Sequence, residues 1–176
     1  MFVWVGISLE DTMKSETKDV IDFSNKNNIL TPLENLPIHV SLRISFEIEE
    51  NIFESVEKEL INYFSKLKPF KICFENIEKL NNIVWLRCEK TKDLMNAHND
   101  LCSMLKDKFN IPLHEFDNDF IYHSTLFMDD PCKIDLLFEK ITQLKFTKNI
   151  ISNKILIGVS ENGNANTYKI YKTIEI

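Results

Sequence analysis

Apolar residues follow two different spacings along the chain, and the order of these spacings predicts a mixed α and β structure. Apolar and polar residues alternate, as in half-buried β-strands, over residues 2–9, 39–48, 70–74, 83–88, 120–128, 154–160 and 167–176. Apolar residues recur every three or four positions, as on one face of an α-helix, over residues 11–28, 51–67, 91–109 and 130–144. We predict that Asp11 or Thr12 caps the first helix, that Thr91 caps the third, and that Asp130-Pro131 begins the fourth.

Two polar segments predict turns between neighbouring strands. Asn81-Asn82 separates two of the predicted strands, and Asn162-Gly163-Asn164 separates the last two. Asparagine and glycine adopt the backbone angles that tight hairpin turns require, so the second segment is typical of a β-hairpin.

The first and second halves of the chain share a pattern of elements and residues. Each half reads strand, helix, strand, helix, strand, and the matching segments are Val3-Trp4-Val5 with Val84-Trp85-Leu86, Thr31-Pro32-Leu33 with Ile111-Pro112-Leu113, and residues 71–75 with 155–159. An internal repeat of this kind predicts a duplicated unit. We therefore predict one domain, residues 1–176, made of two pseudo-symmetric halves at about 1–80 and 81–176.

The repeat also aligns two short histidine motifs, each in a predicted strand. The first is His39-Val40-Ser41-Leu42 and the second is His123-Ser124-Thr125-Leu126. Side chains two residues apart in a strand point to the same face, so each histidine shares a face with a hydroxyl residue. A twofold axis between the halves would turn the two motifs toward each other. Two imidazoles and two hydroxyl donors in one cleft suit the chemistry of a phosphate group.

Four further residues are candidates for the same cleft by alternation. Arg43 continues the series of His39 and Ser41, and a guanidinium is well suited to binding phosphate. Trp4 and Trp85 occupy equivalent positions of the repeat, opposite the main apolar faces of their strands, and Phe127 continues the series of His123 and Thr125. These aromatic side chains either stack on a nucleotide base or pack between the sheets, and the pattern leaves both open.

Composition is that of an ordinary globular protein, with 44% hydrophobic and 27% charged residues. The net charge of −6 argues against tight binding to long duplex nucleic acid, which requires many phosphate contacts. The four cysteines lack the paired spacing of a metal site, the amino-terminal residues lack the pattern of a signal peptide, and no apolar run is long enough for a membrane span. We expect a reduced cytoplasmic protein, monomeric, without membrane contact, metal or other cofactor.

The paired histidine motifs in two similar halves resemble the 2H phosphoesterase superfamily, which includes 2′-5′ RNA ligase-like proteins and cyclic phosphodiesterases. The resemblance covers essentially the whole chain and rests on His39, Ser41, His123 and Thr125. Ser41 stands where threonine is more frequent in that family. The resemblance implies a bilobal α+β fold, built from duplicated β-α-β-α-β units, with two antiparallel sheets lining a central cleft and helices outside. It also implies metal-independent chemistry on 2′,3′-cyclic phosphates or 2′-5′ phosphodiester linkages of a nucleotide or RNA end.

The residues themselves support the same chemistry. Imidazole titrates near neutral pH, so one histidine can remove a proton from the nucleophile while the other protonates the leaving oxygen. We favour His39 as acid and His123 as base in hydrolysis, with the roles reversed in ligation, although the sequence does not decide between the two assignments. Ser41 and Thr125 are expected to bind the non-bridging phosphate oxygens. The alternatives are a non-catalytic module that binds a nucleotide or RNA end in the same cleft, and a protein with a structural or interaction role.

Overall fold

The computed structural model describes residues 1–164 and 167–176. Within these residues, four α-helices, three short 3-10 helices and eight strands follow one another in an order close to the predicted one. In chain order the elements are β1 (Phe2–Ser8), α1 (Lys14–Asn27), η1 (Pro32–Glu34), β2 (His39–Glu47), η2 (Glu50–Ile52), α2 (Phe53–Phe64), β3 (Phe70–Leu80), β4 (Ile83–Cys88), α3 (Lys92–Phe109), η3 (Glu115–Asp117), β5 (His123–Met128), α4 (Pro131–Ile141), β6 (Asn149–Ser152), β7 (Lys154–Ser160) and β8 (Lys169–Glu175).

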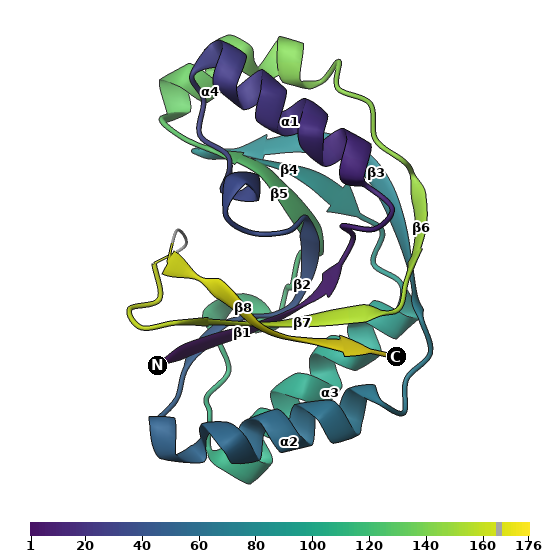
Figure 1. Ribbon diagram of the computed structural model, residues 1–176, viewed down its shortest axis with the longest axis vertical. Coiled ribbons are helices and arrows are strands. Elements are labelled where there is room, and N and C mark those ends of the chain that lie inside the picture. Colours follow the sequence, from purple (N-terminus) through teal and green to yellow (C-terminus); the bar gives the residue numbers. More distant parts are fainter. Residues whose placement is uncertain (165–166) are drawn as a thin grey trace.

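The strands form two antiparallel sheets of four strands each. The first sheet has the order β2-β1-β7-β8 and the second has the order β5-β4-β3-β6. Figure 1 shows α1 and α4 covering the second sheet at the top and α2 and α3 covering the first sheet at the bottom, with both sheets between the helix pairs. We call the face of each sheet that lies away from its helices the inner face. The predicted bilobal α+β fold with two antiparallel sheets is confirmed.

The first half of the sequence contributes β3 to the second sheet, and the second half contributes β7 and β8 to the first sheet. β3, from the first half, pairs with β4, whereas β7, from the second half, pairs with β1 along residues 2–7. The helices follow the same exchange, because α1 lies over the second sheet and α3 lies over the first (Figure 1). The predicted halves are therefore continuous in sequence but interlocked in space.

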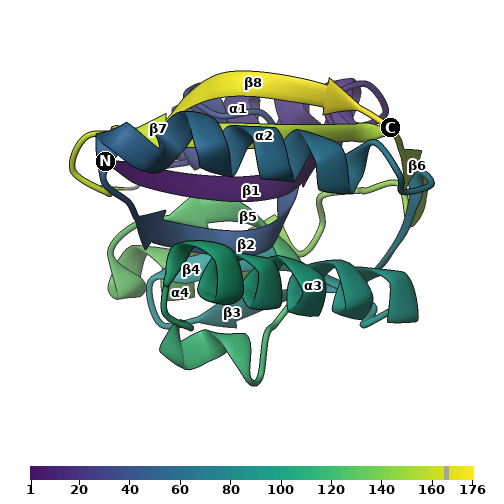
Figure 2. The ribbon, with the colours of Figure 1, turned by 90° about the horizontal axis from the view of Figure 1, so that it is seen from below.

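The helix-facing side of each sheet forms the main hydrophobic core. In β1 the alternate residues Val3, Val5 and Ile7 are fully buried on that side, as the alternation predicts. Figure 2 shows α2 and α3 lying side by side beneath the first sheet, where Tyr63 donates a hydrogen bond to Asp100 between them. Within the described residues, no helix has the length and apolarity needed to cross a bilayer.

The structure departs from the predicted elements at several places. Strand β3 continues to Leu80, beyond the predicted residues 70–74. The first helix begins at Lys14 rather than at a cap on Asp11 or Thr12, because residues 10–13 form a turn in which the Met13 amide donates to the Leu9 carbonyl. A short strand that the pattern did not predict, β6, pairs with β3. The predicted hairpin of the last two strands is present, because β7 and β8 pair antiparallel and Gly163 has a positive φ of 74°.

Candidate active site

The two motif histidines lie at equivalent places on the inner faces of the two sheets. Both are the first residues of edge strands, and in the sheet ladders His39 faces Ser8 on β1 while His123 faces Arg87 on β4. Both side chains are partly exposed. They are close enough that a positive charge on His123 lowers the pKa of His39.

Each imidazole is oriented by a hydrogen bond to the backbone two residues earlier. Nδ1 of His39 lies 2.8 Å from the Pro37 carbonyl oxygen, and Nδ1 of His123 lies 2.8 Å from the Ile121 carbonyl oxygen. Because a carbonyl oxygen only accepts, we assign the proton of each neutral ring to Nδ1. Nε2 of each ring therefore carries a free lone pair, which is the form that a general base needs.

An indole ring packs against each of these histidines. The Trp4 and His39 rings stack with their centroids 4.4 Å apart. The Trp85 and His123 rings are tilted, with their centroids 4.5 Å apart. Both tryptophans are on the inner faces, as alternation predicts, but they are only 5% and 7% exposed. Their buried rings support the imidazoles and leave little surface for a base. Of the two alternatives that the sequence leaves open, the geometry therefore favours packing over stacking on a base.

Burial lowers the pKa of both histidines. Removal from water disfavours the charged imidazolium and lowers the pKa of His39 to about 4, although the bond to the Pro37 carbonyl acts in the opposite direction. Burial also lowers the pKa of His123, and the positive charge of Arg87 lowers it further, against the effect of the Ile121 carbonyl. Both rings are therefore neutral at pH 7 in the unliganded protein.

The hydroxyl residues of the two motifs lie on the same inner faces. Ser41 pairs with Gly6 on β1, and Thr125 pairs with Trp85 on β4. Both side chains are partly exposed. Among the residues that the structure describes, neither hydroxyl is hydrogen-bonded to another protein atom. Both are therefore free to donate to a ligand.

A β-bulge in each motif changes the face of the residue that follows it. Val5 faces Arg43 and Gly6 faces Ser41, so Leu42 has no partner on β1. In the second sheet, the pairs of Val84 with Phe127 and Trp85 with Thr125 leave Leu126 without a partner in the same way. An extra residue of this kind reverses the alternation along a strand.

The bulges make two of the predicted site assignments wrong. Arg43 does not continue the face of Ser41: it is 2% exposed and forms an ion pair with Asp117, with 3.0 Å between Nη1 and Oδ1. Phe127 does not continue the face of Thr125: it is fully buried and packs against Phe23 of α1. Neither side chain is available for a ligand on the inner face.

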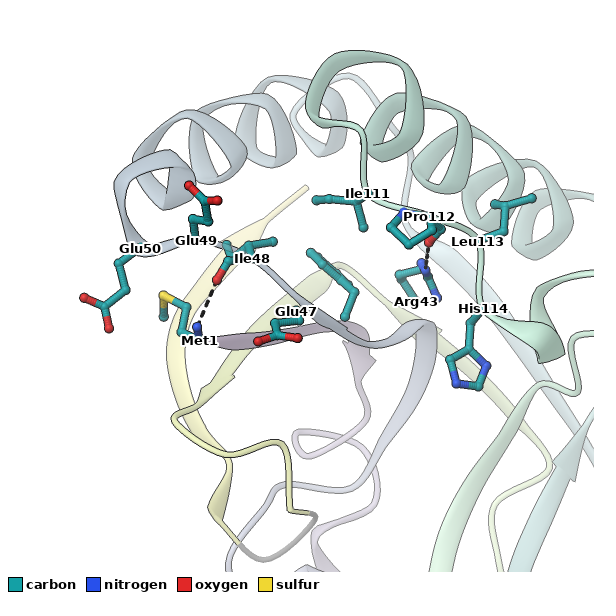
Figure 3. A pocket seen from close by; sticks show the side chains of 11 residues that line it. Met1, Arg43, Glu47, Ile48, Glu49, Glu50, Ile111, Pro112, Leu113 and His114 are labelled. Carbon is teal, nitrogen blue, oxygen red and sulfur yellow. Dashed lines mark hydrogen bonds between the residues drawn. The ribbon is translucent and has the colours of Figure 1, made fainter.

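Figure 3 shows the surroundings of Arg43, where its Nη2 donates a hydrogen bond to the Pro112 carbonyl. Arg43 lines a pocket of about 710 Å³ together with residues 46–50, Met1 and residues 111–114. Neither His39 nor His123 lines this pocket. It lies at the far end of β2 and is separate from the candidate active site.

Arg87 is the cation that sequence reasoning missed on the inner face of the second sheet. It faces His123 across the ladder, and its side chain is 37% exposed. Its Nη1 lies 3.3 Å from Oε2 of Glu78, which also accepts a hydrogen bond from Trp85 Nε1. The signal was present, because Arg87 is two residues after Trp85 and therefore shares its face.

One group of potential metal ligands comes together within the described part of the chain. It consists of His98, Cys102 and Asp117, which are all buried. The Arg43 guanidinium already neutralises Asp117, and burial, followed by the charge of Asp117, raises the pKa of the Cys102 thiol to about 11. Since a metal needs a thiolate, these residues fit a hydrogen-bonded network better than a metal site.

Known proteins were compared with the chain by sequence and by structure. No protein-family model matches it. A Bacillus licheniformis protein that is provisionally named a phosphoesterase is 34% identical over 77 residues, which are 42% of this chain and 46% of that relative. The chain thus matches about half the length of the relative.

The solved structures match over nearly the whole chain. TT0787 of Thermus thermophilus has a TM-score of 0.66 at 13% identity, covering 99% of this chain and 97% of that chain. E. coli LigT in complex with 3′-AMP has a TM-score of 0.58 at 13% identity, and the match covers 99% of this chain and 96% of the LigT chain. The chain has the fold of LigT. LigT structures have also been solved with phosphate, ATP and NADP+.

The comparisons bear on the prediction at two levels. The solved structures show the fold that the resemblance implies. The Bacillus licheniformis relative supports the broader class of phosphoesterases. The roles of His39, Ser41, His123 and Thr125, and the identity of the substrate, remain predictions.

Proposed function

We propose that the protein is a metal-independent phosphoesterase that acts on a 2′,3′-cyclic phosphate or a 2′-5′ phosphodiester linkage of a nucleotide or RNA end. The observation that carries this proposal is the matched pair His39 and His123. Both rings lie on inner faces, both have Nδ1 fixed on a backbone carbonyl, and both have a lowered pKa. The nucleotide complexes of LigT support a nucleotide as ligand.

In hydrolysis of a cyclic phosphate, the two imidazoles would divide the proton transfers. Nε2 of one histidine takes a proton from the attacking water as the new P–O bond forms. The other histidine, as imidazolium, gives a proton to the leaving ribose oxygen as the old P–O bond breaks. Burial lowers the pKa of both histidines, so both assignments of acid and base are compatible with the pKa shifts, including the one favoured from sequence.

Three other side chains would stabilise the charge that develops on the phosphate. The unpaired hydroxyls of Ser41 and Thr125 are available to donate to the non-bridging oxygens. Arg87 lies beside His123 and would exchange its exposed contact with Glu78 for a stronger one with the phosphate. An anion held there would also raise the pKa of His123 and thereby supply the protonated acid.

The test is an activity assay with 2′,3′-cyclic nucleotides, cyclic-phosphate-ended oligonucleotides and 2′-5′-linked dinucleotides, each with and without chelator. We expect turnover that chelator does not reduce, and a loss of about 10²-fold to 10⁴-fold in His39→Ala and in His123→Ala. His114→Ala is the matched control, because this histidine lines the separate pocket at the far end of β2. Wild-type turnover by either active-site variant would refute the mechanism.

Calorimetry with the same ligands separates catalysis from the alternative of a binding module. Binding of a cyclic nucleotide without any turnover would favour the non-catalytic module. Neither binding nor turnover would favour a structural or interaction role.

A further inference from the structure

The bulged leucine of each histidine motif is held by a side chain that lies outside the sheet. The Leu126 carbonyl accepts a hydrogen bond from the Thr31 hydroxyl, with 2.6 Å between the oxygens. The Leu42 carbonyl oxygen lies 2.8 Å from Nδ1 of His98. All the polar atoms involved are buried, where a carbonyl oxygen needs a donor.

Both donors are themselves fixed in place. Thr31 is 7% exposed and its hydroxyl oxygen also accepts a hydrogen bond from the Leu33 amide, so it caps η1. His98 is 2% exposed on α3, and its ring stacks on Phe120 with 4.2 Å between centroids. Nε2 of His98 lies 3.1 Å from the Asp117 carbonyl oxygen. Because a neutral imidazole carries one N–H, we assign the proton to Nδ1, which makes the shorter contact with the Leu42 carbonyl oxygen.

The donors cross between the two halves of the chain. Thr31 belongs to the first half and holds the motif of the second half, whereas His98 belongs to the second half and holds the motif of the first. Each held leucine directly follows the hydroxyl residue of its motif, Ser41 or Thr125.

We propose that Thr31 and His98 are positioning residues, each of which fixes the β-bulge of the other half's motif and so aims its histidine and hydroxyl. Thr31 positions His123 and Thr125, and His98 positions His39 and Ser41. Without the donor, a strand can return to regular pairing, which reverses the face of the residues on one side of the bulge. The hydrogen bonds do not touch the reacting atoms and act only through the strand.

The experiment compares Thr31→Val, which removes the hydroxyl at similar volume, with Thr31→Ser, which retains it. Proton NMR of the imidazole rings follows the titration of His39 and His123 in each variant. We expect Thr31→Val to move the chemical shifts and titration midpoint of His123, with a smaller change in the titration of His39, because the charge of His123 acts on the pKa of His39. In Thr31→Ser, the titrations of His39 and His123 should both be as in the wild type. A change at His39 as large as that at His123, or no change at either, would overturn the proposal, since general loosening of the fold does not select one motif.

The reciprocal variants test the other donor. His98→Leu should disturb His39 and leave His123 unchanged, whereas His98→Asn keeps an amide donor near the position of Nδ1 and should restore His39 in part. One measurement uses the wild-type protein and therefore does not depend on the folding of a variant. In ¹⁵N NMR, we expect a slowly exchanging proton on Nδ1 of His98. An unprotonated Nδ1 would refute the His98 part of the proposal.

The kinetic readout rests on the proposed phosphoesterase function, but the NMR readout does not. With a substrate that the wild type turns over, Thr31→Val should lower kcat by about 10-fold to 100-fold and change KM by less than about twofold, because misplaced groups affect the transition state most. Absence of activity in the wild type would count against the proposed function alone. The NMR comparison would still decide whether Thr31 positions His123.

Discussion

Gly158 of β7 makes room for the ring that packs on His39, so adding a methyl group there is a sharp test of the site. Gly158 faces Trp4 in the β1–β7 ladder. A Cβ atom at this position would lie 2.1 Å from Nε1 and 2.4 Å from Cε2 of Trp4. Because such contacts are far shorter than van der Waals distance, the Gly158→Ala variant must displace the indole by about 1 Å or more.

The magnitude follows from two effects. Overpacking of a dense region typically lowers the free energy of unfolding by about 1–3 kcal/mol. Loss of the ring stack with His39 adds about 0.5–1.5 kcal/mol. We therefore expect Gly158→Ala to lower the free energy of unfolding by about 1.5–4.5 kcal/mol. Displacement of the indole also exposes His39 to water, so the pKa of His39 should rise from about 4 toward its ordinary value of 6.5.

Urea unfolding measures the first effect and NMR titration of the His39 ring measures the second, with His123 as the internal reference. The matched background is Trp4→Leu, which has no ring atom near Gly158. In the Trp4→Leu background, Gly158→Ala should lower the free energy of unfolding by less than about 1 kcal/mol. The difference between the losses with and without the indole gives the coupling energy of positions 4 and 158. The reasoning fails if the methyl group costs the same with and without the indole, or if the titration of His39 does not move.

Three further outcomes are expected. Arg87→Gln should raise KM for a phosphate substrate by about 10-fold to 100-fold, which is the usual contribution of a charged hydrogen bond to binding, and Arg87→Lys should raise KM less. An unchanged KM in Arg87→Gln would exclude Arg87 from phosphate binding. The pH profile of kcat/KM should be bell-shaped, because one histidine must be neutral and the other protonated, and a flat profile would contradict this pairing. The free energy of unfolding should fall as the pH drops from 6.5 toward 4, because the unfolded chain then binds more protons than the folded one. His39 accounts for at most about 3 kcal/mol of this loss. Urea unfolding of His39→Gln at several pH values should therefore show a smaller change of the free energy of unfolding with pH.

The sequence predicts the inner-face positions correctly up to the leucine of each motif and fails immediately after it. Alternation places His39 and Ser41 correctly because the period of two holds without interruption that far. Arg43 looked like the next inner-face residue, since it is polar and two positions further on. The second motif did contain a warning, because Leu126 and Phe127 are consecutive apolar residues and regular alternation cannot bury both on one side.

Other features depend on contacts between distant segments, which a local pattern does not contain. Strand β6 has only four residues and is defined by its pairing with β3. The buried ion pair of Arg43 with Asp117 joins β2 to a loop 74 positions away. Alternation reports which side of a strand is buried but not which strand lies beside it, so the exchange of β3 and β7 was not predictable.

The exchange of strands explains why the two halves depend on each other although each carries a complete histidine motif. A chain ending at the Asn81-Asn82 turn would contain β1 and β2 but would lack β7, which covers the other edge of β1. It would also lack His98, which holds the bulge of the first motif. We expect residues 1–80 and 81–176, expressed separately, to lack cooperative unfolding transitions in circular dichroism, and to regain one when mixed. Independent cooperative folding of either half would show that the paired sheets, and the crossing hydrogen bonds at Leu42 and Leu126, are not required to form the site.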